Sequence, residues 1–149
     1  MLKELLTRET IQLHISCKDW IEAIQAGTSI LLERGSVEQR YEETIIENFK
    51  KYGPYMVIAP GIVLSHARPE NGVNTLSMSL VTLQTPVHFG NETNDPVKLI
   101  ITLAATDNKT HLKALEQLME LLMNKDDMRA MVTATDIDNI IAIIHKYSV

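Results

Sequence analysis

The sequence predicts a single α/β domain over residues 1–149, in which helices cover both faces of one sheet. Helix-type patterns come before and after a central group of strand-type segments, and this order favours a helix layer on each side. Within that group, residues 97–105 (VKLIITLAA) are almost continuously apolar, as is typical of a central strand buried on both faces. No linker or internal repeat divides the chain, and a chain of this length can bury a core of its own.

The first third of the chain begins with one strand and one helix. Residues 10–15 (TIQLHI) alternate in the way that suits a short strand. Ser16 and Asp19 then form a capping signal for a helix that runs to Leu32, and Gly35 closes that helix.

A second capping signal, Ser36 with Gln39, opens the next helix, which Gly53 and Pro54 stop. Its apolar residues recur at helical spacing and predict the side that packs inward: Tyr41, Ile45, Phe49 and Tyr52. Two helices therefore precede the central strands.

Three strand candidates occupy the middle of the chain, at residues 56–65, 76–83 and 97–105. The first contains a Pro-Gly break, and the second (LSMSLVTL) alternates apolar side chains with Ser or Thr. Between the second and third, residues 86–96 (PVHFGNETNDP) are rich in turn-forming residues and predict a long exposed loop.

The last third of the chain is predicted to be helical. Asp107 can cap a helix that leaves the third strand, a shorter helix covers residues 126–131, and Thr135 with Asp138 opens a helix over residues 137–147. The residues predicted to face the core are Leu112, Leu115, Met119 and Leu122 in the first of these helices and Ile140, Ile141 and Ile144 in the last.

Composition and charge exclude several classes of protein. The net charge is −5, with Lys and Arg scattered along the chain, so there is no basic surface for nucleic acid. Charges interrupt the N-terminal leucines, unlike those of a signal peptide, and the longest apolar run, residues 56–64, is far shorter than the roughly 20 residues of a membrane span. Cys17 is the only cysteine and cannot form an intramolecular disulfide. We expect a cytoplasmic protein that does not insert into a membrane.

Two histidines lie where α/β sheets place ligands, beyond the ends of strands. His66 follows the first central strand, and Arg68 would share its face if the strand persists, placing a cation beside any bound anion. His111 lies in the first turn of the helix after the third strand, where free N–H groups favour an anion. A histidine at a strand end is by itself more often structural than catalytic, so the argument depends on these neighbours.

Phosphoryl transfer through histidine joins these features. A neutral imidazole is a good nucleophile near pH 7, and the transition state spreads negative charge over three oxygens that need fixed donors. His66 is therefore the candidate nucleophile, and His111, Thr110 and Arg68 are candidate donors.

Two other kinds of site have weaker support. A zinc hydrolase would need a third ligand from Glu70, Asp95 or Asp107, and no H-x-x-x-H or C-x-x-C spacing is present. Ser65 beside His66 suggests a serine hydrolase, but adjacent strand residues point to opposite faces and no G-x-S-x-G motif occurs. Nothing matches a P-loop or G-x-G-x-x-G, so we expect no bound ATP.

Two segments resemble one protein family. Residues 52–74 (YGPYMVIAPGIVLSHARPENGVN) resemble the active-site segment of the enzyme IIA components of the bacterial phosphoenolpyruvate-dependent sugar phosphotransferase system, in the fructose–mannitol superfamily. Residues 94–118 (NDPVKLIITLAATDNKTHLKALEQL) resemble that family's second histidine segment. The ascorbate-type branch is most similar through its GPY, APG and H-A/G-RP-E-x-GV pattern, and the likeness extends over nearly the whole chain.

The resemblance implies a mixed, roughly five-stranded sheet flanked by helices. It also implies that His66 accepts a phosphoryl group from the phosphocarrier protein HPr and passes it to a cysteine of the cognate IIB component, while His111 helps to hold the group. IIB serves the membrane component IIC, and the branch points to ascorbate or a related compound as the sugar. No metal or organic cofactor is implied, and the resemblance does not decide whether the protein forms a homodimer. The alternative is a regulatory module of the nitrogen type, in which phosphorylation controls a partner.

The chain departs from the family pattern around the active histidine. Most relatives carry Pro before it and often Gly after it, where this chain has Ser65 and Ala67. Loss of the Pro restores a backbone N–H and frees the φ angle. In mannitol- and fructose-type members an arginine on the preceding helix assists the phosphate, and that position falls near Asn48 here. We hypothesise that Arg68 takes its place.

Overall fold

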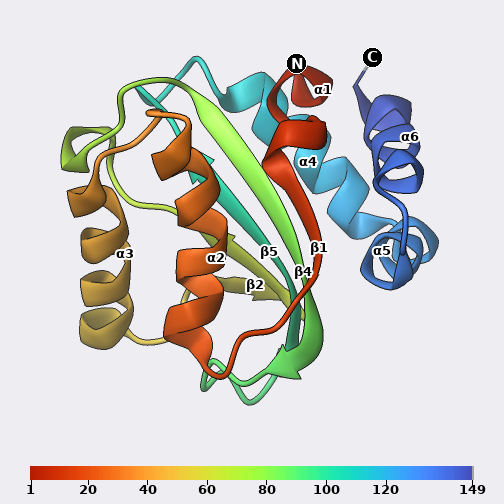
Figure 1. The fold of residues 1–149 in the computed structure, drawn as a ribbon, viewed down its shortest axis with the longest axis horizontal. Coiled ribbons are helices and arrows are strands. Elements are labelled where there is room, and N and C mark those ends of the chain that lie inside the picture. Colours follow the sequence, from red (N-terminus) through yellow and green to blue (C-terminus); the bar gives the residue numbers. More distant parts are fainter. Residues whose placement is uncertain (149) are drawn as a thin grey trace.

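A five-stranded mixed sheet lies between two layers of helices in the computed structural model, which describes residues 1–148 (Figure 1). The helices are α1 (Leu2–Leu5), α2 (Trp20–Glu33), α3 (Gln39–Tyr52), α4 (Leu112–Met123), α5 (Lys125–Thr133) and α6 (Ile137–Tyr147), with 3-10 turns η1 (Arg8–Thr10) and η2 (Pro69–Asn71). The strands are β1 (Ile11–Ile15), β2 (Val57–Ala59), β3 (Ile62–Ser65), β4 (Ser77–Val87) and β5 (Val97–Ala104). None of the helices within residues 1–148 is long and apolar enough to cross a membrane.

The strands are ordered β1-β4-β5-β3-β2 across the sheet. The pairs β1–β4 and β3–β5 are parallel, and the pairs β4–β5 and β2–β3 are antiparallel. This confirms the mixed, five-stranded sheet, and it confirms the central place predicted for β5. Because β3 and β5 run in the same direction, the two segments that follow them leave the sheet at the same edge.

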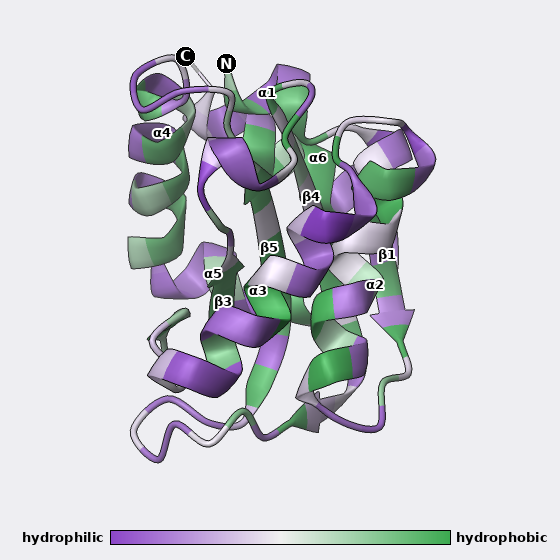
Figure 2. Ribbon diagram, turned by 90° about the vertical axis from the view of Figure 1, so that its left-hand side faces the viewer, coloured by the Kyte–Doolittle hydropathy of each residue, from purple (hydrophilic) through white to green (hydrophobic). Residues whose placement is uncertain are grey.

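The two faces of the sheet carry separate apolar clusters. Helices α2 and α3 cover one face, and α1, α4, α5 and α6 cover the other (Figure 1). Leu99, Ile101 and Leu103 of β5 pack into the second cluster, while Ile100 and Ala104 pack into the first. Strand side chains alternate between faces, so burial of both faces explains the continuous apolar run. Figure 2 shows the outward face of α3 to be mostly hydrophilic, as expected for a covering helix.

The helix starts differ in part from the sequence prediction. Asp19 is the cap of α2, accepting a hydrogen bond from the Glu22 N–H at 2.9 Å. Ser36 does not cap α3, because Val37 pairs with Val73 in an isolated bridge and keeps the chain extended as far as Glu38. The short helix α1 was not predicted, and it packs against α4 and α6.

The inward faces of two helices also differ from the prediction. Tyr52, predicted to face inward, is 63% exposed. In α4, Leu112 is exposed, the other predicted residues are only partly buried, and the fully covered side chains include Leu118 and Leu121. Helix α1 packs against α4, and the buried Gln117 side chain accepts a hydrogen bond from the Leu2 N–H at 2.9 Å. The sequence pattern of α4 alone could not reveal that contact.

Strand β4 is longer than predicted, and the loop after it is shorter. It continues to Val87, which pairs with Val97 at the start of β5. Pro86 is tolerated here because β1 pairs only as far as Leu83 of β4, so the rest of β4 has a free edge on that side. Phe89, expected in an exposed loop, is buried.

Candidate active site

His66 and His111 lie at the same edge of the sheet, as the parallel pairing of β3 and β5 requires. His66 directly follows β3, and His111 is the residue before the first turn of α4, seven residues beyond the end of β5. Both line one open cavity of about 660 Å³. Crevices beyond the carboxyl ends of strands are the usual ligand sites of α/β sheets.

The imidazole of His66 is held by one hydrogen bond from its own strand. Its Nδ1 lies 3.0 Å from the carbonyl oxygen of Leu64. A carbonyl oxygen can only accept, so the proton of the neutral ring is on Nδ1 and the lone pair is on Nε2. Nε2 has no protein partner within residues 1–148. In the neutral form of this half-buried ring, Nε2 is therefore the nitrogen without a proton.

Arg68 lines the same cavity, although not for the reason predicted. β3 ends at Ser65, so Arg68 does not share a strand face with His66 and instead begins the η2 turn. Its side chain is 84% exposed, and its ion pair with Glu70 is long, at 4.0 Å. Exposed pairs of this kind are weak, so the guanidinium is free to turn towards an anion in the cavity.

His111 and Thr110 occupy different environments. The Nδ1 of His111 is buried and has no hydrogen-bond partner within residues 1–148. Thr110 is exposed and does not line the cavity. Asp107 does not cap α4 directly; it accepts hydrogen bonds from the N–H groups of Lys109 and Thr110, each at 2.7 Å, and these bonds lower the pKa of its carboxyl group.

Helix α3 contributes cavity residues that the site prediction did not include. Thr44, Asn48 and Tyr52 line the cavity at four-residue spacing along one side of the helix. Thr44 donates its hydroxyl to the Arg40 carbonyl at 2.7 Å, while the Asn48 amide makes no hydrogen bond within the described chain. The four-residue spacing does not by itself show that α3 borders a cavity, so the sequence offered no local signal for these residues. A free amide at Asn48 can donate to an anion.

The arrangement of these side chains does not support the zinc-site hypothesis. Within residues 1–148, no group of three or more His, Cys, Asp or Glu side chains could hold a metal ion. The cavity instead brings together the His66 imidazole, the Arg68 guanidinium and the Asn48 amide, which come from separate elements. Such groups can bind an oxyanion.

Comparison with known proteins identifies the family. The family model described as phosphoenolpyruvate-dependent sugar phosphotransferase system, EIIA 2, matches residues 4–147. The chain belongs to this family. Over 141 residues, this EIIA chain is 40% identical to the ascorbate-specific PTS system EIIA component of Salmonella typhi, and the match covers 92% of each chain.

Solved structures of EIIA proteins share the fold. The mannitol-specific cryptic phosphotransferase enzyme IIA, CmtB, from Escherichia coli is 34% identical, with a TM-score of 0.88 over 97% of this chain and 98% of that one. The IIA–mannitol protein of Escherichia coli, solved in complex with phosphorylated IIB–mannitol, has a TM-score of 0.82 over 95% and 99% of the two chains. Because the identity is only 21%, this likeness shows a shared fold and nothing more. The protein is thus a sugar phosphotransferase component with the EIIA fold.

Proposed function

We propose that this EIIA protein relays a phosphoryl group through His66, from phospho-HPr to a cysteine of a cognate IIB component. The observation that carries the proposal is the bond between His66 Nδ1–H and the Leu64 carbonyl at 3.0 Å, which leaves Nε2 free to attack. Family membership supports the phosphotransfer role, and the EIIA–IIB complex of the mannitol system supports the choice of acceptor.

The transfer conserves atoms and charge without a redox step. The lone pair of His66 Nε2 attacks the phosphorus of the donor phosphohistidine, a new N–P bond forms, and the donor N–P bond breaks. The phosphorylated ring keeps its Nδ1 proton and becomes positively charged, so the Leu64 carbonyl stabilises it as an acceptor. A thiolate of IIB then attacks the same phosphorus, and the ring of His66 returns to its neutral form.

The remaining cavity residues would stabilise the phosphoryl oxygens. Arg68 supplies a mobile cation, and His111 supplies an imidazole with an unpartnered nitrogen. Asn48 lines the cavity and offers a free amide from α3. By the family resemblance, mannitol-type members carry an arginine near this position. Thr110 can donate only if the turn before α4 rearranges, because it does not line the cavity. Together these groups replace water around the charge that develops in the transition state.

The transported compound is proposed to be ascorbate or a similar sugar acid. This rests on the identity of 40% to an ascorbate-specific EIIA component. The protein would act in the cytoplasm, passing phosphate to IIB and through IIB to the membrane component IIC. The nitrogen-type regulatory module is the competing function, and it predicts phosphorylation of His66 without onward transfer to a IIB cysteine.

The test is to incubate the purified protein with phosphoenolpyruvate, enzyme I and HPr and to measure its intact mass. We expect the gain of one phosphoryl group in the wild type and none in His66→Ala. His145→Ala, a change in an exposed residue of α6 remote from the cavity, is the matched control and should gain the group normally. Phosphorylation that persists in His66→Ala would refute the assignment. Adding an ascorbate-type IIB then separates the two functions, since only the relay transfers the label to its cysteine.

A further inference from the structure

Tyr41 joins the segment of His66 to the end of β5 through a single buried hydroxyl. The side chain projects from the first turn of α3 and has no exposed surface. Its oxygen accepts a hydrogen bond from the Ala67 N–H at 3.0 Å and lies 2.6 Å from the Leu103 carbonyl oxygen. A hydroxyl has one proton, and the short distance assigns that proton to Leu103 rather than to the Ala67 carbonyl at 3.4 Å.

This arrangement fixes the backbone directly beside the reactive ring. Ala67 follows His66, and the residue two positions before His66 supplies the carbonyl that orients its Nδ1. Leu103 belongs to β5, the strand whose following segment carries His111. The phenol of Tyr41 therefore ties both histidine segments to α3. Without the hydroxyl, the Ala67 N–H and the Leu103 carbonyl would lose a buried partner.

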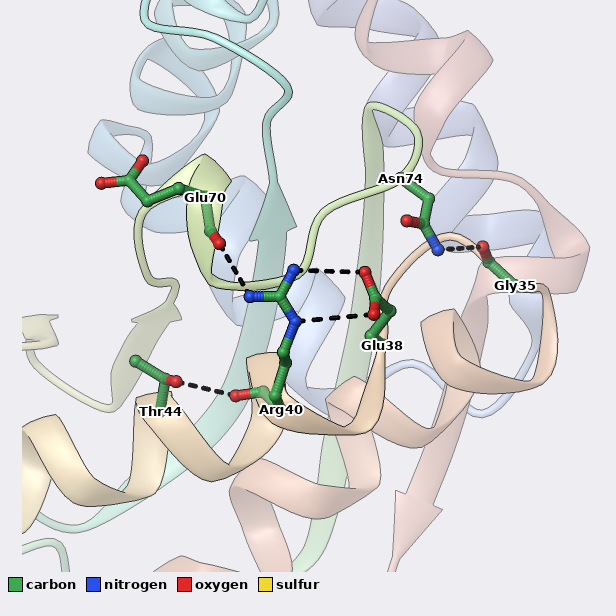
Figure 3. A network of polar contacts seen from close by, with 6 residues as sticks. All are labelled: Gly35, Glu38, Arg40, Thr44, Glu70 and Asn74. Atoms are coloured by element: carbon green, nitrogen blue, oxygen red, sulfur yellow. Dashed lines mark hydrogen bonds and ion pairs between the residues drawn. The ribbon is translucent and has the colours of Figure 1, made fainter.

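The neighbouring residue of α3 holds the other end of the loop that carries His66. Arg40 donates to the Glu70 carbonyl at 2.9 Å while it pairs with Glu38, as Figure 3 shows. The Glu38 N–H donates to the Gly72 carbonyl at 2.8 Å. A side chain at Gly72 would meet the Tyr41 nitrogen at 3.3 Å, and φ there is +124°, so this close approach requires glycine.

We infer that Tyr41 is a positioning residue for phosphoryl transfer: its hydroxyl sets the location of His66 Nε2 by holding the Ala67 backbone against β5. Tyr41 does not line the cavity and touches no reacting atom. The inference rests on the function proposed above. Arg40 and Gly72 support the same loop at a second point, so Tyr41 acts on the placement of the ring and not on the existence of the loop.

The test compares Tyr41→Phe with Tyr147→Phe in the full chain. Tyr147 makes the same kind of phenol contact, donating to Asp127, but it lies on α6, on the other side of the sheet. Each change removes one hydroxyl and keeps the ring. Phosphorylation by phospho-HPr is measured as an initial rate, at a temperature where urea titration shows both variants to be folded. The tautomer of His66 is read from nitrogen-15 correlation spectra of the imidazole.

We expect Tyr41→Phe to slow transfer by about 10- to 100-fold, the scale produced by small misplacements of reacting groups. The His66 ring should also lose its uniform Nδ1–H state. Tyr147→Phe should keep the wild-type rate and spectrum. Equal slowing in both variants, or a wild-type rate and tautomer in Tyr41→Phe, would overturn the inference.

Two further measurements separate the role of Tyr41 from a failure of the proposed function and from misfolding of the variant. If wild-type protein is not phosphorylated by HPr, the proposed function fails, while the tautomer comparison still decides the role of Tyr41. If Tyr41→Phe does not fold, hydrogen exchange of the wild-type protein decides instead. The Ala67 amide should then be protected as strongly as amides of β5, and exchange at the rate of an exposed loop amide would count against the inference.

Discussion

The buried phenol of Tyr41 predicts a specific loss of stability at alkaline pH. Burial raises the pKa of Tyr41 from its ordinary 10.0 to about 12 in the folded protein. Because the folded pKa is above the unfolded one, its contribution to stability is complete below about pH 10 and is lost as pH rises towards 12. With 1.36 kcal/mol per pKa unit, the free energy of unfolding should fall by about 2 kcal/mol by about pH 11.5 through this residue alone.

The assay is urea unfolding of the wild type and Tyr41→Phe at about pH 9 and about pH 11.5. Tyr41→Phe should start less stable at the lower pH, and the gap between the two proteins should narrow by about 2 kcal/mol at the higher pH. Titration of Tyr55, Tyr147 and the lysines is common to both proteins and cancels in the difference. A gap that stays constant between the two pH values would show that the Tyr41 hydroxyl is not held neutral in the fold, and would refute the reasoning.

Two other predictions test the packing of the sheet and the phosphate contacts. A Cβ at Gly27 would lie 2.2 Å from Thr102 Oγ1, so Gly27→Ala should destabilise the protein by about 1–3 kcal/mol in urea unfolding. In a Thr102→Ala background this hydroxyl is absent, and Gly27→Ala should cost little stability or stabilise the protein by up to about 1 kcal/mol. An equal loss of stability in both backgrounds would contradict the contact between position 27 and Thr102. Arg68→Ala should slow phosphorylation of His66 by roughly tenfold, without moving the urea midpoint, because the loss of one charged donor is worth about 1.4 kcal/mol or more. Arg129→Ala, an exposed arginine outside the cavity, is the matched control, and equal rates in both variants would remove Arg68 from the mechanism.

The parts of the fold that depend on local pattern were predictable. The bounds of α6 match the prediction, and the central position of β5 follows from its continuous apolar run. The errors fall where distant segments meet. Helix α1 is too short to show a periodic pattern, and its contact with Gln117 adds a buried polar residue to α4 that the apolar pattern did not include. The start of α3 was misplaced because Val37 pairs with a residue 36 positions away.

The site was predictable in its chemistry and less so in its geometry. The motifs placed His66 and His111 at strand ends, and the parallel pairing of β3 with β5 brings those ends to one cavity. The expected link between His66 and Arg68 through a continuing strand was wrong, since the strand stops at Ser65. Asn48 entered only through the resemblance, because nothing in its local sequence shows that α3 borders the cavity.

The unusual flanks of His66 can be understood from the contacts that replace Pro and Gly. The Leu64 N–H donates to the Met56 carbonyl of the chain entering β2, and successive N–H groups of a strand alternate in direction, so the N–H of Ser65 faces β5, its partner in register. Strand pairing thus fixes the backbone that a Pro ring would otherwise restrict. Among residues 1–148, the only non-glycine residue with a positive φ is His14, so Ala67 adopts a conformation open to any L residue and needs no Gly. The Ala67 N–H, which a Gly at this position would also carry, donates to the Tyr41 hydroxyl at 3.0 Å. In this chain, hydrogen bonds to β5 and to α3 therefore hold the backbone on both sides of His66.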